Sequence, residues 1–212
     1  MRRIIRPLVL VGGGGHCKSV IEAAESAGYS ILGVLDMPEN IGKEILSTKV
    51  IGTDDDIPKY VDKAEFIITV GFITNPATRI KLYNRIKEVG GKLATIIAST
   101  AYVSKYATIS EGTVIMHHAF VNARAKVGKN VIINSFACIE HDSTIGDHCH
   151  ISTGAIVNGG CLVGENVFIG SQSVLANNAV VGNDIIISAG SFVKNSITKQ
   201  GLYFGNPAHI HT

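Results

Sequence analysis

The stretch VIINSFACIEHDSTIGDHCHISTGAIVNGG, residues 131–160, carries isoleucine or valine at every sixth position, and this spacing decides the fold. A period of six fits neither an α-helix, which repeats every 3.6 residues, nor a half-buried strand, which repeats every two. It is typical of a β-helix, in which short strands and turns alternate and about 18 residues close one triangular coil. We therefore expect every sixth residue to point into the core of such a coil.

The same spacing extends well beyond this stretch. Sixteen branched aliphatic residues follow one another at intervals of six: Val103, Ile109, Ile115, Val121, Val127, Ile133, Ile139, Ile145, Ile151, Val157, Val163, Ile169, Leu175, Val181, Ile187 and Val193. The position two residues before each of them is small in most hexads, as a narrow corner requires. No hexad is interrupted by an insertion, so functional groups must lie on the turns or at a junction with another subunit.

The chain before residue 99 follows another pattern. Apolar runs over residues 7–11, 31–35, 65–71 and 92–97 predict strands, and residues 16–27 and 77–89 have the spacing of helices, each followed by a glycine. Strands that alternate with helices predict a small parallel α/β sheet of Rossmann type. We therefore expect two domains, an α/β domain over residues 1–98 and a β-helix over residues 99–212.

The composition excludes several classes of protein. Hydrophobic residues make up 46% of the 212 residues and charged ones 17%, with a formal net charge of +2, which excludes a disordered tail and a polybasic arm for nucleic acid. No apolar run approaches the roughly 20 residues that span a bilayer, and the basic start has no cleavage site. The four cysteines form no C-x-x-C pair, so we expect reduced thiols in a cytoplasmic protein.

A glycine-rich loop, Gly12-Gly13-Gly14-Gly15, lies between the first predicted strand and the first predicted helix. Backbone N–H groups of such a loop, together with a helix N-terminus, bind phosphate. Asp36 ends the second predicted strand, where a carboxylate would accept hydrogen bonds from a ribose. A nucleotide or nucleotide-sugar site is the favoured interpretation. The alternative is a strand–turn–helix that needs glycine for its geometry alone.

Within the hexads, the segment Ile139-Glu140-His141-Asp142 places an imidazole beside a carboxylate at a predicted corner. Imidazole titrates near neutral pH, and a neighbouring carboxylate can orient the ring, as a general base requires. A solvated turn histidine is the alternative for His141 taken alone. The eight histidines also raise the possibility of metal binding, but no spacing brings three of them together, and we expect no metal site.

Both halves of the chain together resemble a known family. Gly15-His16, Asp36, the unbroken hexads with His141-Asp142, and a closing segment at residues 205–208 are similar to the sugar acyltransferases of the sialic acid O-acetyltransferase type. The nearer likeness is to the UDP-4-amino-sugar N-acetyltransferases of bacterial glycan synthesis. This resemblance implies a left-handed β-helix, a homotrimer, acetyl-CoA in the groove between neighbouring helices, and a nucleotide sugar on the N-terminal domain.

The resemblance also implies roles for individual residues. His141 would be the catalytic base and Asp142 its carboxylate partner, although such enzymes carry the longer glutamate at the second position. The residues implied for the nucleotide sugar are Gly14, Gly15, His16, Asp36 and Gly71. Those implied for the coenzyme are Asn134, His150, Gly159 and Ala189, the last at a position where such enzymes have glycine.

Four functions follow as hypotheses, and the last of them is a metal-dependent hydratase, which bound zinc in the purified protein would support. The first is acetyl transfer from acetyl-CoA to the amine of a UDP-linked amino sugar. The second keeps the same chemistry but acetylates a hydroxyl of sialic acid or another sugar, since one base serves both acceptors. The third is a trimeric scaffold that binds a nucleotide sugar without catalysis, against which the intact His141-Asp142 pair argues. None of these hypotheses requires nucleic acid or a membrane.

Overall fold

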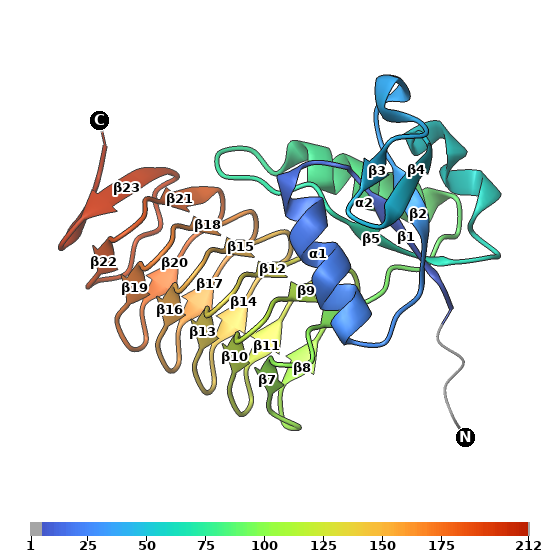
Figure 1. Cartoon of the computed structure of the whole chain (residues 1–212). Helices are drawn as coiled ribbons and strands as arrows, with labels where there is room; N and C mark the ends of the chain where they lie inside the picture. The colour runs from blue at the N-terminus through green and yellow to red at the C-terminus, as the bar shows by residue number, and fades with distance from the viewer. Residues whose placement is uncertain (1–5, 212) are drawn as a thin grey trace.

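The computed structural model describes residues 6–211 and contains an α/β domain packed against one end of a long β-helix (Figure 1). The sheet of the α/β domain has the order β3-β4-β2-β1-β5, in which only the pairing of β3 with β4 is antiparallel. Its strands are β1 (Leu8–Val11), β2 (Ile31–Leu35), β3 (Glu44–Ile45), β4 (Thr48–Gly52) and β5 (Glu65–Ile68). The three carboxyl ends of β1, β2 and β5 therefore lie at one edge.

Helices cover both faces of this sheet, so its strands read as continuous apolar runs. One face packs against α1 (Gly15–Ser26) and the other against α2 (Ala77–Glu88) and the 3₁₀ turn η2 (Asp54–Lys59); a second 3₁₀ turn, η1, covers Pro38–Asn40. Both predicted helices are present, and each ends one residue before its predicted end. Gly28 and Gly90 follow them with φ of 83° and 78°, the left-handed conformation that stops a helix.

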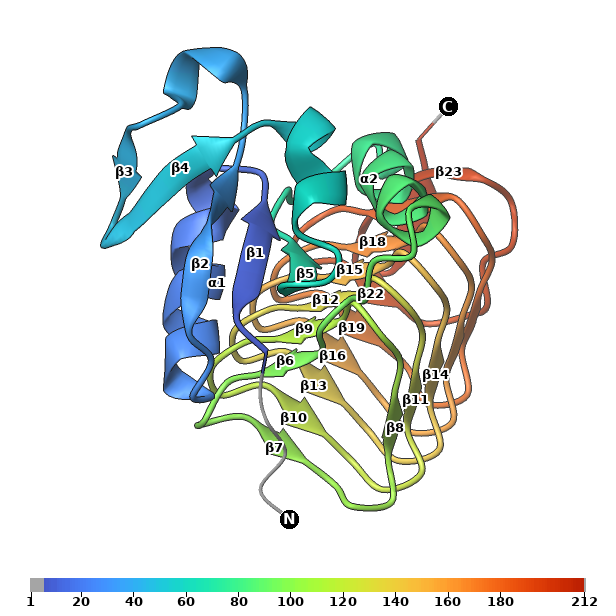
Figure 2. The same cartoon turned by 90° about the vertical axis from the view of Figure 1, so that its right-hand side faces the viewer.

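The rest of the chain forms a left-handed parallel β-helix with three faces, and Figure 2 shows its triangular coils stacked one behind another. The first face contains β6 (Ile96–Ile97), β9 (Val114–Ile115), β12 (Ile132–Ile133), β15 (His150–Ile151), β18 (Phe168–Ile169) and β21 (Ile185–Ile187), followed by the hairpin of β23 (Gly201–Gly205) and β24 (Ala208–Ile210). The second contains β7 (Tyr102–Val103), β10 (Phe120–Val121), β13 (Cys138–Ile139), β16 (Ile156–Val157), β19 (Val174–Leu175) and β22 (Phe192–Val193). The third contains β8 (Thr108–Ile109), β11 (Lys126–Val127), β14 (Thr144–Ile145), β17 (Leu162–Val163) and β20 (Val180–Val181).

The hexad pattern corresponds directly to the core of this β-helix. Every one of the sixteen periodic residues lies in a strand, and from Ile115 onward all of them are buried. The small residues at the corners also have a hydrogen-bonding function. For example, Ser143 Oγ donates to the carbonyl of Asn158 at 2.8 Å and accepts from the amide of Cys161 at 3.2 Å. Adjacent coils are therefore linked inside the core as well as along the strands.

The junction of the two domains differs from the sequence-based expectation. We predicted one strand over residues 92–97, but the structure divides it: Leu93 bridges Phe66 of the α/β sheet, whereas Ile96 and Ile97 form β6 and pair with β9 of the first coil. Apolar side chains of α1, Ile96 and Val114 belong to one buried cluster. A continuous core thus fixes the α/β domain on the β-helix, and the division at residue 99 stays a prediction.

Two further expectations concern the chain as a whole. All four cysteines have free thiols, and three of them are buried. None of the helices in residues 6–211 has the length and apolar character needed to cross a membrane. Part of the basic start of the chain, residues 1–5, lies outside the described residues.

Candidate functional site

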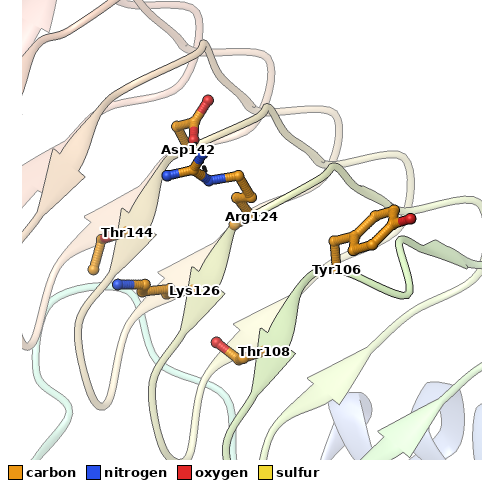
Figure 3. Close-up of a pocket in the computed structure, with 7 residues that line it drawn as sticks. Tyr106, Thr108, Arg124, Lys126, Asp142 and Thr144 are labelled. Atoms are coloured by element: carbon orange, nitrogen blue, oxygen red, sulfur yellow. Dashed lines mark ion pairs between the residues drawn. The ribbon is translucent and has the colours of Figure 1, made fainter.

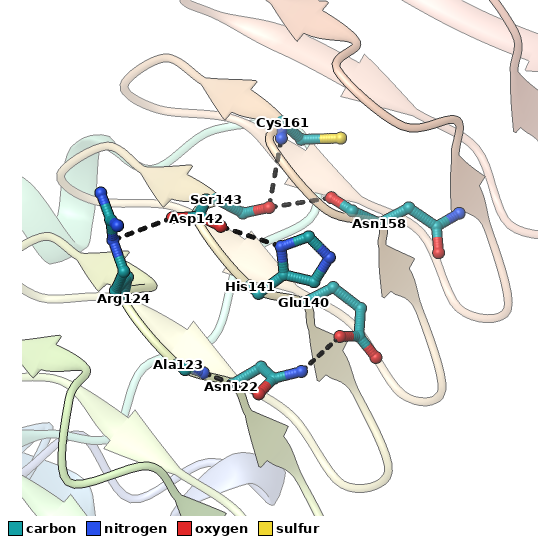
Figure 4. Close-up of polar contacts among 9 residues, drawn as sticks. All are labelled: Asn122, Ala123, Arg124, Glu140, His141, Asp142, Ser143, Asn158 and Cys161. Atoms are coloured by element: carbon teal, nitrogen blue, oxygen red, sulfur yellow. Dashed lines mark hydrogen bonds and ion pairs between the residues drawn. The ribbon is translucent and has the colours of Figure 1, made fainter.

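His141 and Asp142 lie at the corner between the second and third faces (Figure 4). The Nδ1 atom of His141 is 2.9 Å from Oδ2 of Asp142, so the aspartate reaches the imidazole although it is one methylene shorter than glutamate. Asp142 has a φ of 60°, a left-handed conformation that aspartate adopts more readily than most residues. The contact with His141 is the main cause that lowers the pKa of the Asp142 carboxyl below its ordinary value.

The imidazole of His141 lies across Gly159 of the next coil. A Cβ atom added to Gly159 would come within 2.7 Å of Nε2 of His141, so any side chain there would displace the ring. An ionised Asp142 accepts a hydrogen bond, so Nδ1 carries the proton of neutral His141 and Nε2 presents its lone pair. In the described part of the chain, Nε2 has no hydrogen-bond partner, so it is available to a substrate.

Asn134 and His150, both predicted to contact the coenzyme, lie together on the first face. The amide of Asn134 contacts Nε2 of His150 at 3.3 Å, and Nδ1 of His150 donates to the carbonyl of Phe72 at 2.8 Å. Phe72 belongs to the loop between β5 and α2, so the N-terminal domain holds this imidazole in place. His150 is therefore neutral with its proton on Nδ1.

A cavity of about 420 Å³ opens beside His150. Its walls include Ala189, one of the residues implied for the coenzyme, together with Ser152 and Phe168 of the β-helix and Ile73 and Thr74 of the N-terminal domain. Apolar walls with a few hydroxyl groups suit a thin chain that carries amides, such as the pantetheine arm of a coenzyme. The contribution of Ile73 and Thr74 was missed from the sequence, because a contact between domains leaves no local pattern.

His16, predicted to contact the nucleotide sugar, is half-buried next to His150, with 6.4 Å between the ring centroids. Burial lowers the pKa of His16 to about 3, with smaller contributions from Arg79 and His150, and burial likewise lowers the pKa of His150 to about 4. Nε2 of His16 is buried and has no hydrogen-bond partner within residues 6–211. His16, predicted for the nucleotide sugar, and His150, predicted for the coenzyme, therefore lie side by side.

These two histidines predict a loss of stability in mild acid. Because their folded pKa values lie below the unfolded value of about 6.5, the unfolded state binds more protons, and the free energy of unfolding decreases as pH falls. Each group contributes a slope of up to about 1.4 kcal/mol per pH unit below pH ~6. Urea titrations between about pH 7 and 5, above the range in which carboxyl groups protonate, measure this slope. It should be smaller in His16→Gln, and equal stability at both pH values would contradict the prediction.

The other residues predicted for the nucleotide sugar lie at the carboxyl edge of the α/β sheet. Helix α1 begins at Gly15, and its N-cap, Gly14, provides no side-chain hydrogen bond to the first turn. Gly71 follows β5 and lies beside His16. A Cβ atom added to Gly71 would be 3.7 Å from the Cβ of His16. Ligands of parallel α/β sheets bind at this edge, where strand ends and helix N-termini meet.

Asp36 follows β2 and accepts a hydrogen bond from the amide of Asn40 at 2.8 Å. A Cβ atom at Gly13 would come within 2.4 Å of the Asp36 carboxylate, so this glycine is required if the loop is to approach the acid. Gly13 was not among the residues predicted for the nucleotide sugar, so this role was missed from the sequence. A hollow of about 200 Å³ next to Asp36 is lined also by Asp55 and Arg85.

The structure does not bring the two halves of the predicted acetyl-transfer site together in one chain. His141 and Gly159 lie at the corner between the second and third faces, whereas His150 and the cavity lie on the first face. In a triangular coil this corner is opposite the first face, and the packed core separates them (Figure 2).

Arg79 was not predicted from the sequence at all. Its guanidinium is fully buried and donates to the carbonyls of Ile68, Val70 and Asn130 and to the side chain of Asn130. Within residues 6–211 it has no carboxylate partner. Burial lowers the pKa of Arg79 to about 9. It links α2, the end of β5 and a corner of the β-helix. An arginine on a helix is usually exposed, so no sequence signal indicates this role.

No group of three or more histidine, cysteine, aspartate or glutamate side chains in residues 6–211 is arranged to hold a metal ion.

Comparisons with known proteins agree with this arrangement. Residues 7–86 match the PglD N-terminal domain, and residues 124–159 and 160–195 match the bacterial transferase hexapeptide, a model of six repeats. An uncharacterized protein, L142 of Acanthamoeba polyphaga mimivirus, is 31% identical over 121 residues, which is 56% of this chain. The match spans 23% of that viral protein.

Solved structures resemble the chain over nearly its whole length. PerB from Caulobacter crescentus, solved with CoA and GDP-perosamine, is 28% identical with a TM-score of 0.90 and covers 97% of both chains. The acetyltransferase domain of PglB from Neisseria gonorrhoeae, solved with acetyl coenzyme A, is 28% identical with a TM-score of 0.89, over 98% of this chain and 100% of that domain.

Proposed function

Because this chain is a hexapeptide-repeat sugar acyltransferase with a PglD-type N-terminal domain, we propose that it transfers the acetyl group of acetyl-CoA to the amine of a nucleotide-linked amino sugar. The observation that carries the proposal is the His141–Asp142 pair, whose free Nε2 lies at an exposed corner of the β-helix. The likeness to PerB, solved with GDP-perosamine, favours an amine over a hydroxyl as the acceptor.

The proposed reaction requires little from the protein beyond a base and a fixed geometry. Nε2 of His141 accepts the proton that the acceptor amine loses while its nitrogen bonds to the thioester carbonyl carbon. The carbon–sulfur bond breaks, and CoA leaves as its thiolate. Asp142 stabilises the imidazolium that forms, since its carboxylate contacts Nδ1. The backbone N–H of Gly159, which donates no hydrogen bond within residues 6–211, would stabilise the negative charge on the carbonyl oxygen.

We further propose that two copies of the chain form each site. His141 and the cavity beside His150 face opposite sides of one β-helix, so a coenzyme in the cavity can meet only the His141 of a neighbour. A homotrimer with threefold symmetry provides this contact three times. UDP as the nucleotide, glycan biosynthesis as the pathway and the cytoplasm as the location are parts of the same proposal.

A panel of acceptors tests the proposal. Release of the CoA thiol from acetyl-CoA is measured with UDP- and GDP-linked 4-amino sugars, with the matching 4-hydroxy sugars and with free sialic acid. We expect release with one or more of the amino sugars and none with the hydroxy sugars. Activity on sialic acid alone would support O-acetylation instead. Thermal stabilisation by the sugars without release of CoA would support a scaffold.

Asp36→Asn should weaken binding of the nucleotide sugar. A carboxylate accepts a charge-assisted hydrogen bond from a ribose hydroxyl, and its replacement by an amide should raise KM for the nucleotide sugar by about tenfold, with kcat little changed. Steady-state kinetics at saturating acetyl-CoA measure this effect. Asp55→Asn is the matched control, because Asp55 borders the same hollow but its side chain is 88% exposed and pairs with Arg85. Equal KM values for the two variants would contradict the role of Asp36.

A further inference from the structure

The Asp142 carboxylate makes two contacts, one with each oxygen. Oδ2 contacts Nδ1 of His141 at 2.9 Å, and Oδ1 contacts Nε of Arg124 at 3.0 Å. The three side chains therefore form a row, Arg124–Asp142–His141, that ends at the free Nε2 (Figure 4). Arg124 is not among the residues for which the resemblance implies a role.

The coils place Arg124 next to Asp142. The two residues are 18 positions apart and so occupy the same corner in adjacent coils, and both have left-handed backbones with φ of 62° and 60°. The amide of Asp142 donates to the carbonyl of Ala123 at 3.1 Å, which connects the two turns directly. Both backbones are therefore fixed, and the ion pair depends on the side chains alone.

Two other charged groups near this row form no ion pair with Asp142 or His141 within residues 6–211. Glu140 accepts hydrogen bonds from Asn122 and Cys138 and does not contact the imidazole with its carboxylate. Lys126 borders the same hollow as Arg124 and Asp142, a space of about 330 Å³ shown in Figure 3. Within residues 6–211, Lys126 makes no ion pair, so Arg124 is the cation that contacts Asp142.

We propose that Arg124 is a positioning residue, which holds the Asp142 carboxylate against Nδ1 of His141 and so keeps the lone pair of Nε2 directed at the substrate. The effect of Arg124 on catalysis rests on the proposed function, whereas its effect on the position of the Asp142 carboxylate does not. An aspartate at a solvent-exposed corner can rotate away from its neighbour, and a second contact on the other oxygen prevents this rotation. The guanidinium side chain is 81% exposed, so the ion pair adds little to stability and its variants should fold.

The tautomer of neutral His141 tests the proposal without any substrate. Long-range ¹H–¹⁵N NMR spectra of the free protein at about pH 9, where an ordinary imidazole is neutral, distinguish a proton on Nδ1 from one on Nε2. His141→Ala identifies the signal among the eight histidines. We expect the Nδ1–H form to dominate in the unaltered chain and to be largely lost in Asp142→Ala.

Variants of Arg124 and Lys126 decide whether Arg124 acts through its contact with Asp142 or only through its positive charge. Arg124→Ala should shift His141 at least halfway toward the tautomer of Asp142→Ala, whereas Arg124→Lys should retain most of the Nδ1–H form. Lys126→Ala removes a positive charge from the same hollow and should leave the tautomer unchanged. An unchanged tautomer in Arg124→Ala would overturn the proposal. Equal shifts in Arg124→Ala and Lys126→Ala would also overturn it, because they would indicate charge alone.

Kinetics provide the second readout. Arg124→Ala should lower kcat by about three- to tenfold and leave KM for acetyl-CoA unchanged, with partial recovery in Arg124→Lys. If Arg124→Ala shifts the His141 tautomer as expected but the unaltered chain transfers no acetyl group, the positioning role is supported and the proposed function is contradicted. A loss of activity in Arg124→Ala with an unchanged tautomer would instead indicate that Arg124 binds substrate, and would overturn the positioning role.

Discussion

Replacement of His141 by alanine should lower kcat by about 10²- to 10⁴-fold, the usual contribution of a positioned general base. The amine would then have to lose its proton to water while it attacks the thioester. The fold should not change, because the His141 side chain is 59% exposed and contributes nothing to the core of the coils. Release of the CoA thiol at saturating concentrations of both substrates measures kcat, and thermal unfolding measures stability.

A control variant separates the loss of a base from the loss of any surface histidine. His209 is exposed in the terminal hairpin, far along the chain from the corner, and His209→Ala should keep full activity. A variant that retains more than about a third of the original kcat would exclude His141 as the base.

Two inactive variants should recover activity when their chains assemble together. His141→Ala removes the base, and Ala189→Trp fills the cavity beside His150 with a large side chain, so each alone should have almost no activity. If each site takes its base from one chain and its cavity from another, a mixed trimer contains intact sites. Every trimer that contains both variants has one intact site out of three, so purified mixed trimers should recover about a third of the original activity.

This experiment requires that the chains exchange. The two variants are coexpressed with different affinity tags, and purification over both tags gives the mixed assemblies. As a control, each variant is coexpressed with itself under the two tags and purified in the same way. Ala189 is exposed in the single chain, so its replacement should not prevent folding. Mixed assemblies without activity would show that one chain supplies both the base and the cavity, which would contradict a shared site.

The β-helix could be predicted in detail because its physics is local and periodic. Each hexad has an apolar residue that points inward, as Ile133 and Ile139 do, and this pattern occurs sixteen times in the sequence. Strand β4 and the pairing of β6 with the first coil were missed, since they depend on contacts between distant segments. Short strands with mixed burial, such as Thr48–Gly52, do not differ from a loop in sequence alone.

The site was predictable to a different degree in its two halves. His141 and Asp142 are neighbours in the sequence, and their contact follows from that. Arg79, Phe72 and Ile73 reach the first face of the β-helix from the N-terminal domain, and no local pattern announces them. The role of Gly13 beside Asp36 depends on a close approach of two strand ends, which appears only in three dimensions.

The uninterrupted stacking of the coils constrains how this protein can change in length. Removal of one residue from a turn would shift every later column by one place, so that Val157, Leu175 and Val193 would no longer lie above Ile139. Removal of one whole coil would shorten the prism and leave all its columns aligned. Removal of residues is therefore compatible with aligned columns only in steps of one complete coil.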